Sequence, residues 1–311
     1  MKKCSIVVPC YNEEETIQIF YNEMQKYIPK LTDLEFEFIF VDDGSKDHTL
    51  MEMKRLAAED SRVKYISFSR NFGKEAGLFA GLEATTGDYV VTMDVDLQDP
   101  PYLLEDMYKA VSEEGYDCAA TMRTDRKGEA PIRSWFAKRF YRLINKISNA
   151  DIVDGARDYR FMTRQMVDSV LSMKEYNRFT KGIFGWIGFK TKWIPFENVE
   201  RSAGTTKWSF WKLFMYALEG IIAFSTTPLW IASITGVLCC IGAVFAMIFI
   251  IARAAINGDP VPGWPSTITI MLFVGGLQML FLGIQGLYMS KMYLETKNRP
   301  IYIARETNIE K

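Results

Sequence analysis

The sequence has a single histidine, His48, among its 311 residues. A metal site built from several histidines, or a catalytic pair of them, is therefore excluded. Cysteine is also scarce: the five cysteines show no C-x-x-C spacing, and two of them, Cys239 and Cys240, lie within a long apolar run. We interpret the cysteines as reduced thiols rather than as a disulfide framework or a zinc site.

An excess of charge of one sign is missing as well. Lys and Arg total 37 against 38 Asp and Glu, a formal net charge of -1, so the composition does not indicate nucleic acid as a partner. The first residues lack a charged start followed by an apolar core and a cleavage site, because the chain opens on the strand-like segment CSIVVP at 4–9. A membrane anchor is therefore expected only later in the chain.

Long apolar runs occur twice in the last third of the sequence. Neither residues 226–252 nor residues 265–290 contain an acidic or basic side chain. Roughly 20 apolar residues span the hydrocarbon core of a bilayer, so both runs are long enough to cross it with some tilt. We predict a two-helix transmembrane hairpin, and a buried helical hairpin of a soluble protein is the alternative.

Two crossings place both ends of the chain on the same side of a membrane. The link at 253–264 has one Arg and one Asp. The segment 291–311 after the second run carries the basic residues Lys291, Lys297, Arg299 and Arg305. The positive-inside rule predicts a multi-pass protein of the plasma (inner) membrane, with this tail and the N-terminal domain in the cytoplasm.

Strand-like runs alternate with amphipathic stretches in the first part of the chain. The expected strands cover 4–9, 36–43, 63–69 and 89–94, with a further one at 116–123. The expected helices cover 14–28, 47–58, 74–84 and 102–113. This order predicts an α/β fold with a parallel sheet covered by helices, in which ligands bind beyond the carboxyl ends of the strands.

Polar, acidic or glycine-rich residues follow each of the first four expected strands. These segments read VPCYNEEE (8–15), VDDGSKDHT (41–49), SRNFGKEAG (69–77) and MDVDLQDPP (93–101). Because the carboxyl ends of parallel strands meet at one edge of a sheet, we expect a single site built from all four. Asp42 and Asp43 stand just before a helix N-terminus, which favours anions or capping acids. A helix cap is the alternative role for Ser45 or Asp47, so not every acid here is expected to be functional.

Two carboxylates, Asp94 and Asp96, follow the fourth expected strand in the pattern D-x-D, which is a weak signal by itself, and Gln98 stands two residues further on. In an extended segment residues i and i+2 share a face, so both carboxylates would point the same way with Val95 turned into the protein. Two carboxylates suit Mg²⁺ or Mn²⁺, which takes further ligands from water and substrate phosphates, and Gln98 would add a neutral oxygen. An acidic turn without metal is the alternative, and Asp99 before two prolines is expected only to shape the turn.

Two segments combine basic with aromatic and aliphatic side chains. Residues 131–148 show the pattern of an amphipathic helix that lies on an anionic bilayer surface. An ordinary helix packed on the sheet is the alternative, but the two apolar runs favour the interface. Residues 207–225 lead directly into the first apolar run and are expected to form a second, juxtamembrane interfacial helix.

Five segments, in this order, carry a resemblance to a known family: VVPCYNEEE (7–15), VDDGSKDHT (41–49), RNFGKEAGLFAGLEATTGDYVVTMDVDLQDPP (70–101), DYR (158–160) and ERSAGTTKWSFWKL (200–213). The chain resembles a family 2 glycosyltransferase of the polyprenyl-phosphate type, a group that includes bactoprenol glucosyltransferases and dolichyl-phosphate mannose synthases. The resemblance covers nearly the whole chain. D-L-Q-D-P-P and R-N-F-G-K are specific to this group, whereas V-D-D-G-S indicates only the wider superfamily.

The resemblance implies a GT-A fold, a nucleotide-sugar-binding α/β domain that uses a divalent ion. The implied organisation is a cytoplasmic catalytic domain at 1–206 with its interfacial helix near 131–148, a juxtamembrane helix at 207–225, transmembrane helices at 226–252 and 265–290, and a cytoplasmic tail at 291–311. The implied cofactor is Mg²⁺ or Mn²⁺.

The resemblance also implies roles for matching residues. The residues implied to contact the nucleotide sugar are Pro9, Tyr11, Glu13, Asp43, Lys74 and Asp94, with Asp43 near the uracil or ribose. The residues implied to hold the metal are Asp94, Asp96 and Gln98, with Val95 where the family more often has alanine. The residues implied to bind acceptor or donor phosphates are Arg123, Arg133, Arg201 and Lys207. Arg70 and Lys74 would add positive charge near the diphosphate.

Asp158, Asp96 and Arg123 are the residues implied to be catalytic. Asp158 stands in the D-[YF]-R position and would act as a base or orient the acceptor, unless Arg160 beside it makes it part of a structural ion pair. The implied reaction is inverting transfer of a hexose, glucose from UDP-glucose, to undecaprenyl (polyprenyl) phosphate at the cytoplasmic membrane face.

Two alternatives to this function stay open. The same fold could use another donor: GDP-mannose, UDP-GlcNAc, UDP-galactose or an amino-arabinose donor. A catalytically idle membrane scaffold that binds nucleotide and helps a flippase is the other alternative, and the intact acidic and basic motif residues argue against it. A homo-oligomer (tetramer) and a flippase are the protein partners that we consider.

Overall fold

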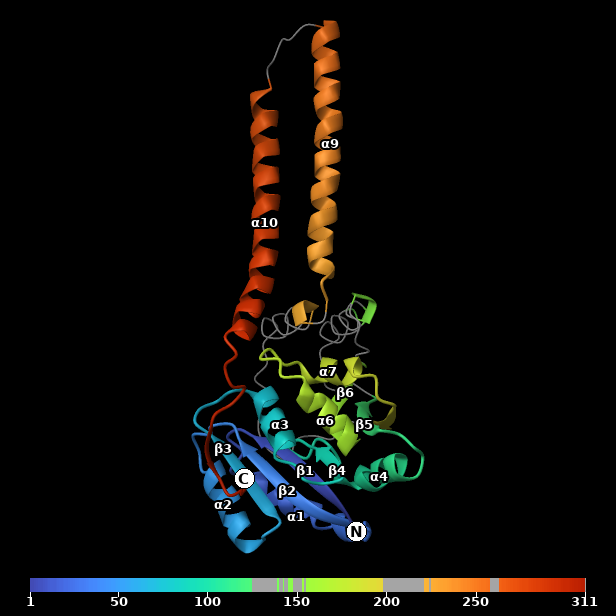
Figure 1. Cartoon of the computed structure of the whole chain (residues 1–311), viewed down its shortest axis with the longest axis vertical. Coiled ribbons are helices and arrows are strands. Elements are labelled where there is room, and N and C mark those ends of the chain that lie inside the picture. Colours follow the sequence, from blue (N-terminus) through green and yellow to red (C-terminus); the bar gives the residue numbers. More distant parts are fainter. Residues whose placement is uncertain are drawn as a thin grey trace.

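A computed structural model of the chain describes residues 1–124, 139, 142, 145–147, 153, 155–197, 221–223, 225–257 and 263–310. The described part consists of an α/β domain and two long helices that project from one end of it (Figure 1). The first and last described residues both lie at the sheet, on the side of the domain away from the tips of the long helices (Figure 1).

The described residues of the domain form one sheet of eight strands in the order β7-β5-β6-β4-β1-β2-β3-β8. The strands are β1 Lys2–Cys10, β2 Leu34–Asp42, β3 Val63–Phe68, β4 Tyr89–Thr92, β5 Cys118–Arg123, β6 Ala156–Thr163, β7 Thr191–Phe196 and β8 Ala304–Thr307. The five expected strands correspond to β1 to β5, so these predictions are confirmed with small shifts in their bounds.

The predicted parallel arrangement is confirmed for the centre of the sheet. β1 pairs in parallel with β2 and with β4, and β2 pairs in parallel with β3. The rest of the sheet is mixed, because β6 lies antiparallel between β4 and β5 and β8 lies antiparallel along β3. Since β6 contains the D-Y-R segment, the sheet itself carries Asp158 toward the carboxyl end of β4.

The helices of the described residues are α1 Ile17–Met24, α2 Thr49–Glu59, α3 Lys74–Glu83, α4 Leu104–Ser112, α6 Arg164–Ser172, α7 Thr180–Trp186, α9 Thr227–Asn257 and α10 Trp264–Thr296, with 3-10 turns at η1 Ile28–Lys30 and η2 Pro101–Leu103. The four helices expected in the first part of the chain correspond to α1 to α4. α1, α2 and α4 cover one face of the sheet, and α3, α6 and α7 cover the other.

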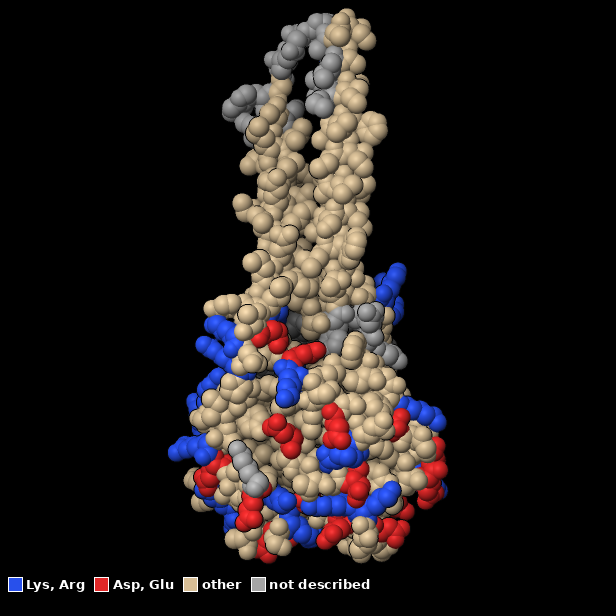
Figure 2. All heavy atoms as spheres, in the orientation of Figure 1, with Lys and Arg blue, Asp and Glu red and all other residues tan. Residues whose placement is uncertain are grey.

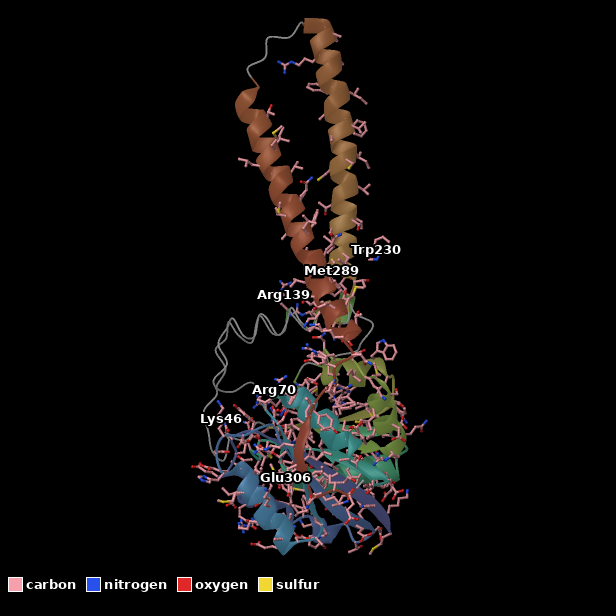
Figure 3. All side chains as sticks on the ribbon, turned by 60° about the vertical axis from the view of Figure 1, so that its left-hand side comes forward. Lys46, Arg70, Arg139, Trp230, Met289 and Glu306 are labelled. Atoms are coloured by element: carbon pink, nitrogen blue, oxygen red, sulfur yellow. The ribbon has the colours of Figure 1, made fainter. Side chains whose placement is uncertain are left out.

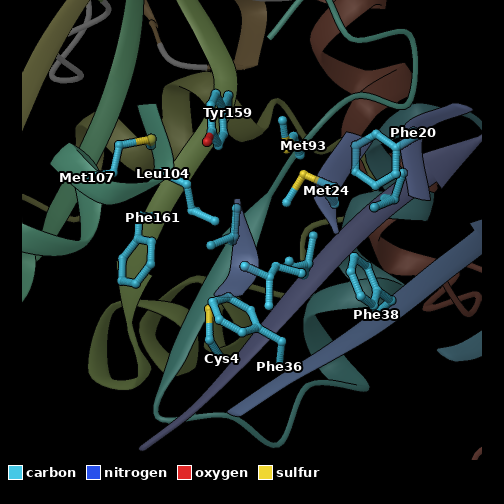
Figure 4. Packing of buried hydrophobic residues seen from close by; sticks show 14 of the residues in the cluster. Cys4, Phe20, Met24, Phe36, Phe38, Met93, Leu104, Met107, Tyr159 and Phe161 are labelled. Carbon is cyan, nitrogen blue, oxygen red and sulfur yellow. The ribbon is translucent and has the colours of Figure 1, made fainter. Parts of the chain in front are cut away.

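Apolar side chains on both faces of the sheet explain why its central strands read as continuous apolar runs. Val8 and Phe40 belong to the cluster under α1, α2 and α4, and Figure 4 shows part of this cluster. Val7 and Val41, one residue away along the same strands, belong to the clusters on the α3 side. Side chains alternate between the faces of a strand, so a sheet covered on both sides buries successive residues of a strand and not every second one.

Gly81 allows α3 to pack close to the sheet. A Cβ atom at this position would lie 2.2 Å from Cγ1 of Val7 and 3.3 Å from Cγ2 of Val41. Both valines are fully buried, and their β-branched side chains have few rotamers with which to give way. The close approach of α3 also determines how near its first residue, Lys74, lies to the carboxyl ends of the strands.

α9 and α10 form the predicted hairpin. At 31 and 33 residues they are each about 45–50 Å long, more than the roughly 30 Å of a bilayer core. The windows Thr227–Ala246 and Ile270–Thr296 are apolar enough to cross a membrane, and neither is buried against the described part of the chain. Figure 2 shows charged side chains over the domain and none along the visible face of the hairpin. Within the described part of the chain neither helix is covered as the core helix of a soluble domain would be, and the crossing of a membrane stays a prediction.

The segment 291–311, expected as a tail, is largely part of the fold. α10 continues to Thr296, and the chain then returns along the domain to add β8 to the edge of β3 (Figure 1). The ring of Tyr302 stacks on Phe68 with centroids 5.0 Å apart, and its hydroxyl donates to Glu83 at 2.7 Å. The strand edge of β3, which would otherwise be open for pairing, is covered by the chain itself.

Candidate active site

The carboxyl ends of β1, β2 and β3 are tied together by hydrogen bonds between their loops. Asn12, with a left-handed φ of 55°, donates its N–H to Ser45 Oγ at 3.0 Å and accepts the N–H of Lys46 at 2.9 Å. Asp42 accepts the N–H of Ser45 at 2.9 Å and the hydroxyl of Ser67 at 2.7 Å. The rim of the expected site is thus built by short side-chain contacts to backbone.

Asp43 fixes the turn that begins α3. Its carboxylate, 4% exposed, accepts the N–H of Phe72 at 2.6 Å and that of Gly73 at 2.9 Å. Burial raises the pKa of Asp43, and the two N–H groups partly offset this. At Gly44 φ is +65° and a Cβ would lie 2.4 Å from the carbonyl carbon of Arg70, so only glycine fits where the two loops meet. A contact of Asp43 with the uracil or ribose stays a prediction.

Lys74, the first residue of α3, joins two carboxylates from different strand ends. Its Nζ lies 2.6 Å from Asp94 Oδ1 and 2.6 Å from Asp158 Oδ2. Burial would lower the pKa of Lys74, but the two carboxylates raise it above its ordinary value. The lysine is therefore a fixed positive charge at neutral pH, and three residues predicted from separate motifs meet at one point.

The register of β6 determines where Asp158 lies. Thr92, the last residue of β4, pairs with Arg160 in the antiparallel ladder, so Asp158 stands beside the segment that follows β4. The hydroxyl of Thr92 donates to the carbonyl oxygen of Asp158 at 2.5 Å. Backbone pairing, rather than a flexible loop, thus delivers this carboxylate to the strand ends.

The ion pair of Asp158 runs to Lys74 and not to Arg160, the alternative partner considered from the sequence. Burial tends to raise the pKa of Asp158, but nearby cations, Lys74 first among them, lower it well below its usual range. The guanidinium carbon of Arg160 lies 4.2 Å from the ring centroid of Phe184 and 5.2 Å from that of Trp193. Arg160 therefore packs on aromatic rings.

Arg157 is a component of the site that sequence reasoning missed. Its Nε donates to Asp99 Oδ1 at 2.8 Å, and one of its terminal nitrogens lies 3.8 Å from Asp94 Oδ2. Asp99 is completely buried, and burial raises its pKa to about 6 against the opposing effect of Arg157. The expectation that Asp99 only shapes a turn is corrected: it is the buried partner of Arg157. The sequence feature that could have indicated this role is the position of Arg157, a charged residue inside a strand and next to the D-Y-R segment.

The D-x-D-x-Q segment is a turn and not an extended strand, which corrects the geometry assumed from the sequence. β4 ends at Thr92, and Leu97 has a left-handed φ of 57°. Asp96 Oδ1 accepts the N–H of Gln98 at 3.2 Å within this turn. Val95 is 4% exposed, so its predicted orientation into the protein is confirmed.

The donor set of this turn fits a hard divalent ion. Asp94 and Asp96 offer carboxylate oxygens, and Gln98 is partly exposed beside them. In the described ranges, no group of three or more His, Cys, Asp and Glu side chains could by itself hold a metal ion. An ion here would take its other ligands from water and phosphate oxygens, which is how Mg²⁺ and Mn²⁺ are commonly bound. The metal assignment stays a prediction.

The residues predicted to lie along the nucleotide come from the end of β1. Tyr11 is 43% exposed on the rim. Glu13 donates its N–H to Thr49 at 2.8 Å, and its carboxylate accepts the hydroxyl of Thr16 at 2.8 Å. Pro9 lies in β1, and its side chain faces Gly77 of α3. Their roles toward a nucleotide stay predictions.

Of the predicted phosphate-binding residues, only Arg123 is described. It ends β5, and its N–H donates to Gly155 at 3.0 Å. Arg133, Arg201 and Lys207 lie outside the described residues, as do most of the segments 131–148 and 207–225. Within the first segment Arg139 is exposed, and Figure 3 shows it at the level of the hairpin base.

Lys74, Asp94 and Asp158 together form an acid–lysine cluster. This cluster, the mixed sheet and the interlocked strand-end loops define a nucleotide-sugar transferase domain of the GT-A class. Residues 5–171 match the family described as glycosyl transferase family 2. The chain belongs to this family, and the predicted fold class and glycosyltransferase activity are confirmed.

Similar proteins cover almost the whole chain. "Putative glycosyltransferase CsbB" of Bacillus subtilis is 44% identical over 305 residues, 98% of this chain and 92% of that protein. "Prophage bactoprenol glucosyl transferase homolog" of Escherichia coli is 42% identical, over 97% of this chain and 98% of that protein. A solved structure of glucosyl-3-phosphoglycerate synthase from Mycobacterium tuberculosis, with Mn²⁺, UDP-glucose and phosphoglyceric acid, is 21% identical, covers 71% of this chain and 78% of that chain, and has a TM-score of 0.48.

Proposed function

We propose that the protein transfers a hexose, glucose from UDP-glucose, to undecaprenyl (polyprenyl) phosphate with inversion at the anomeric carbon. The observation that carries the proposal is the placement of Lys74 between Asp94 and Asp158 at the strand ends of a family 2 domain joined to a membrane-type hairpin. Relatives over nearly the whole chain that are named bactoprenol glucosyl transferase support the lipid phosphate as acceptor and glucose as the sugar.

The reaction requires that the protein bind two anionic substrates next to each other. An acceptor phosphate is already ionised near neutral pH, so its attack on the anomeric carbon needs no strong base. The fixed charge of Lys74 draws phosphate oxygens to the strand ends, and Asp158, kept ionised, holds that ammonium in position. Asp158 is thus assigned a positioning role in place of a strong general base.

A divalent ion, Mg²⁺ or Mn²⁺, is part of the proposal. Asp94, Asp96 and Gln98 would hold it, and it would supply positive charge to the diphosphate leaving group. Arg157 and Lys74 hold the carboxylate of Asp94 from two sides, which keeps it oriented. Arg123, together with Arg133, Arg201 and Lys207, is proposed to bind phosphates of the acceptor or the donor.

The proposed location is the cytoplasmic face of the plasma (inner) membrane, with α9 and α10 crossing it. Lys297, Arg299 and Arg305 lie between α10 and the end of β8, on the domain side of the hairpin. Basic residues next to a membrane span favour the cytoplasmic side, which supports this orientation. A homo-oligomer (tetramer) and a flippase partner stay predictions.

A panel of nucleotide sugars tests the proposed function. Membranes that contain the full chain are incubated with undecaprenyl phosphate and, in turn, UDP-glucose, UDP-galactose, UDP-GlcNAc, GDP-mannose and an amino-arabinose donor. We expect lipid-linked sugar from UDP-glucose in amounts well above those from the other donors. Preference for another donor would overturn the choice of glucose, and no glycolipid from any donor would support the idle scaffold.

A further inference from the structure

The last turns of α10 contact the catalytic domain through a carboxylate. Glu295 accepts the N–H of Tyr176 at 3.0 Å and that of Asn177 at 3.1 Å. One turn earlier, Lys291 donates its ammonium to Asn177 Oδ1 at 3.1 Å. Hydrogen bonds from backbone N–H groups to an ionised carboxylate are among the stronger ones, so the loop at 176–177 is held to the membrane helix.

The same loop continues into α7, which is bound to α3. Thr180, the first residue of α7, donates its N–H at 2.9 Å, and also its hydroxyl, to the carboxylate of Glu75. Glu75 is the second residue of α3. Its neighbour Lys74 is the residue whose ammonium bridges Asp94 and Asp158. Two sets of hydrogen bonds, joined by the backbone of 177–180 and of 74–75, thus lead from α10 to the acid–lysine cluster.

Arg178 holds the middle of this route against the domain. It is 9% exposed, and its guanidinium donates to the carbonyl oxygens of Met173 and Val170. The guanidinium carbon also lies 4.6 Å from the ring centroid of Phe79 in α3. The segment 176–180, which contacts Glu295 at one end and Glu75 at the other, is therefore packed against the domain. Such packing is needed if a shift of α10 is to be passed on to α3.

A cavity of about 730 Å³ lies between α10 and the first turn of α3 and is lined in part by Glu75, Arg178 and Lys291. Because the cavity separates these surfaces, the segment 176–180 forms the hydrogen-bonded route around it. Tyr302, in the chain after α10, contacts Glu83 at the last turn of α3, whereas the segment 176–180 reaches the first turn, where Lys74 lies.

We propose that Glu295 is a positioning residue that transmits the placement of α10 to α3 and thereby holds Lys74 between Asp94 and Asp158. Phosphates of membrane lipids lie at a fixed level, so a catalytic centre tied to a membrane helix is held at a constant distance from them. The expected effect on turnover rests on the proposed function, whereas the connection of α10 to α3 through the segment 176–180 does not.

Kinetics of Glu295→Gln test the consequence for turnover. The full chain is placed in lipid nanodiscs with undecaprenyl phosphate, and glycolipid formation is followed. We expect kcat to fall roughly three- to tenfold while the KM for UDP-glucose stays within about twofold, because Glu295 holds a loop and does not bind the donor. Glu113→Gln, the same change in an exposed carboxylate at the end of α4, should leave both constants unaltered. A kcat of Glu295→Gln equal to that of the control would overturn the proposal.

A double-mutant cycle tests whether the two contacts act on one route. Thr180→Val removes the hydroxyl bond to Glu75 while keeping the shape of the side chain. We expect the double variant Glu295→Gln, Thr180→Val to lose no more kcat than the more affected single variant. Losses that multiply would show two independent structural effects and would contradict the link.

Hydrogen exchange separates this proposal from the proposed function, because it needs no turnover. Glu295→Gln should speed amide exchange at 176–177 and also in α3 at 77–80, with β1 and β2 unchanged as the sign of a folded domain. Faster exchange confined to 176–177 would overturn the link. If the unaltered chain forms no glycolipid, the proposed function fails while this experiment still decides the link.

Discussion

Lys74 and Asp158 are 84 positions apart in the sequence, yet Nζ of one lies 2.6 Å from Oδ2 of the other. The contact joins α3, which connects β3 and β4 of the parallel part of the sheet, to the antiparallel strand β6. Asp94 binds the same ammonium from the end of β4. The pairing of β6 with β4 is therefore what assembles the centre, and the activity is expected to depend on it.

Asp96→Ala should weaken the binding of Mn²⁺ in the presence of UDP by about tenfold or more, a loss of about 1.4 kcal/mol or more. The physical reason is that the site offers few protein ligands, so one carboxylate supplies a large share of the metal-binding free energy. Electron paramagnetic resonance of free Mn²⁺ measures the change. Asp106→Ala, in the exposed first turn of α4, is the control. Equal Mn²⁺ binding by the two variants would show that the metal assignment is wrong.

Asp99→Asn should lower the thermal midpoint of the detergent-solubilised chain, with a loss of about 3 kcal/mol of stability. The reason is that the side chain of Arg157, only 18% exposed, would lose its ionic partner at 2.8 Å and keep only the more distant Asp94 at 3.8 Å. Differential scanning fluorimetry measures the shift. Glu59→Gln, which removes one partner of the exposed pair with Arg55, should leave the midpoint where it is. Similar shifts for both variants would contradict a buried ion pair.

Gly81→Ala and Gly77→Ala form a matched pair in α3. The new methyl group at Gly81 would meet Val7 at 2.2 Å, so we expect a loss of about 1–3 kcal/mol. At Gly77 the nearest atom would be 3.4 Å away, at Pro9, which is an ordinary contact. Ala is the better helix former, so Gly77→Ala should be neutral or stabilising by up to about 1 kcal/mol. Urea unfolding compares them, and equal losses would contradict the close packing of α3.

Glu37 gives the domain a defined dependence on acid. Burial tends to raise its pKa, but Lys3, Ser5 and Lys64 lower it from 4.5 to about 2. Because the folded pKa lies below the unfolded one, the stabilisation is complete above pH about 4.5 and is lost as the pH falls toward about 2.

Glu37→Gln should therefore lower the free energy of unfolding by about 3 kcal/mol at neutral pH and flatten its fall in this acid window. Unfolding curves from neutral pH down to the acid limit measure both effects. Glu35→Gln changes the exposed acid of the same strand and serves as the control. If the free energy of unfolding of Glu37→Gln fell as steeply in this acid window as that of the control, the stabilising role of ionised Glu37 would be contradicted.

The sequence allowed the centre of the fold to be predicted because its signals are local. Continuous runs of buried side chains mark β1 to β4, and the polar residues after them, Lys74 and Asp94 included, indicated the site edge. Asp158 was found through its motif, but its ion pair with Lys74 depends on the register of β6. Register is set by the packing of a whole strand, which a short motif does not contain.

The features that sequence reasoning missed depend on contacts between distant segments or on unusual backbone. Arg157 and Asp99 are 58 positions apart, and nothing in either segment alone indicates that they meet. Leu97 adopts a positive φ that is rare for leucine, so an extended course was the natural expectation for the acidic segment. β8 is only four residues long and carries charges, which hid its pairing with β3.

Transfer of labelled glucose by Asp158→Asn tests the central claim most directly. The full chain in membranes is given UDP-[¹⁴C]glucose, undecaprenyl phosphate and Mg²⁺ or Mn²⁺, and labelled lipid is counted. Asparagine keeps the shape of the side chain but removes the charge that holds Lys74, so we predict a fall in kcat of roughly 100-fold with the KM for UDP-glucose within about twofold. Asp168→Asn, at an acid on α6 whose side chain is 62% exposed, should transfer glucose at the unaltered rate. A rate for Asp158→Asn equal to that of this control would contradict the account.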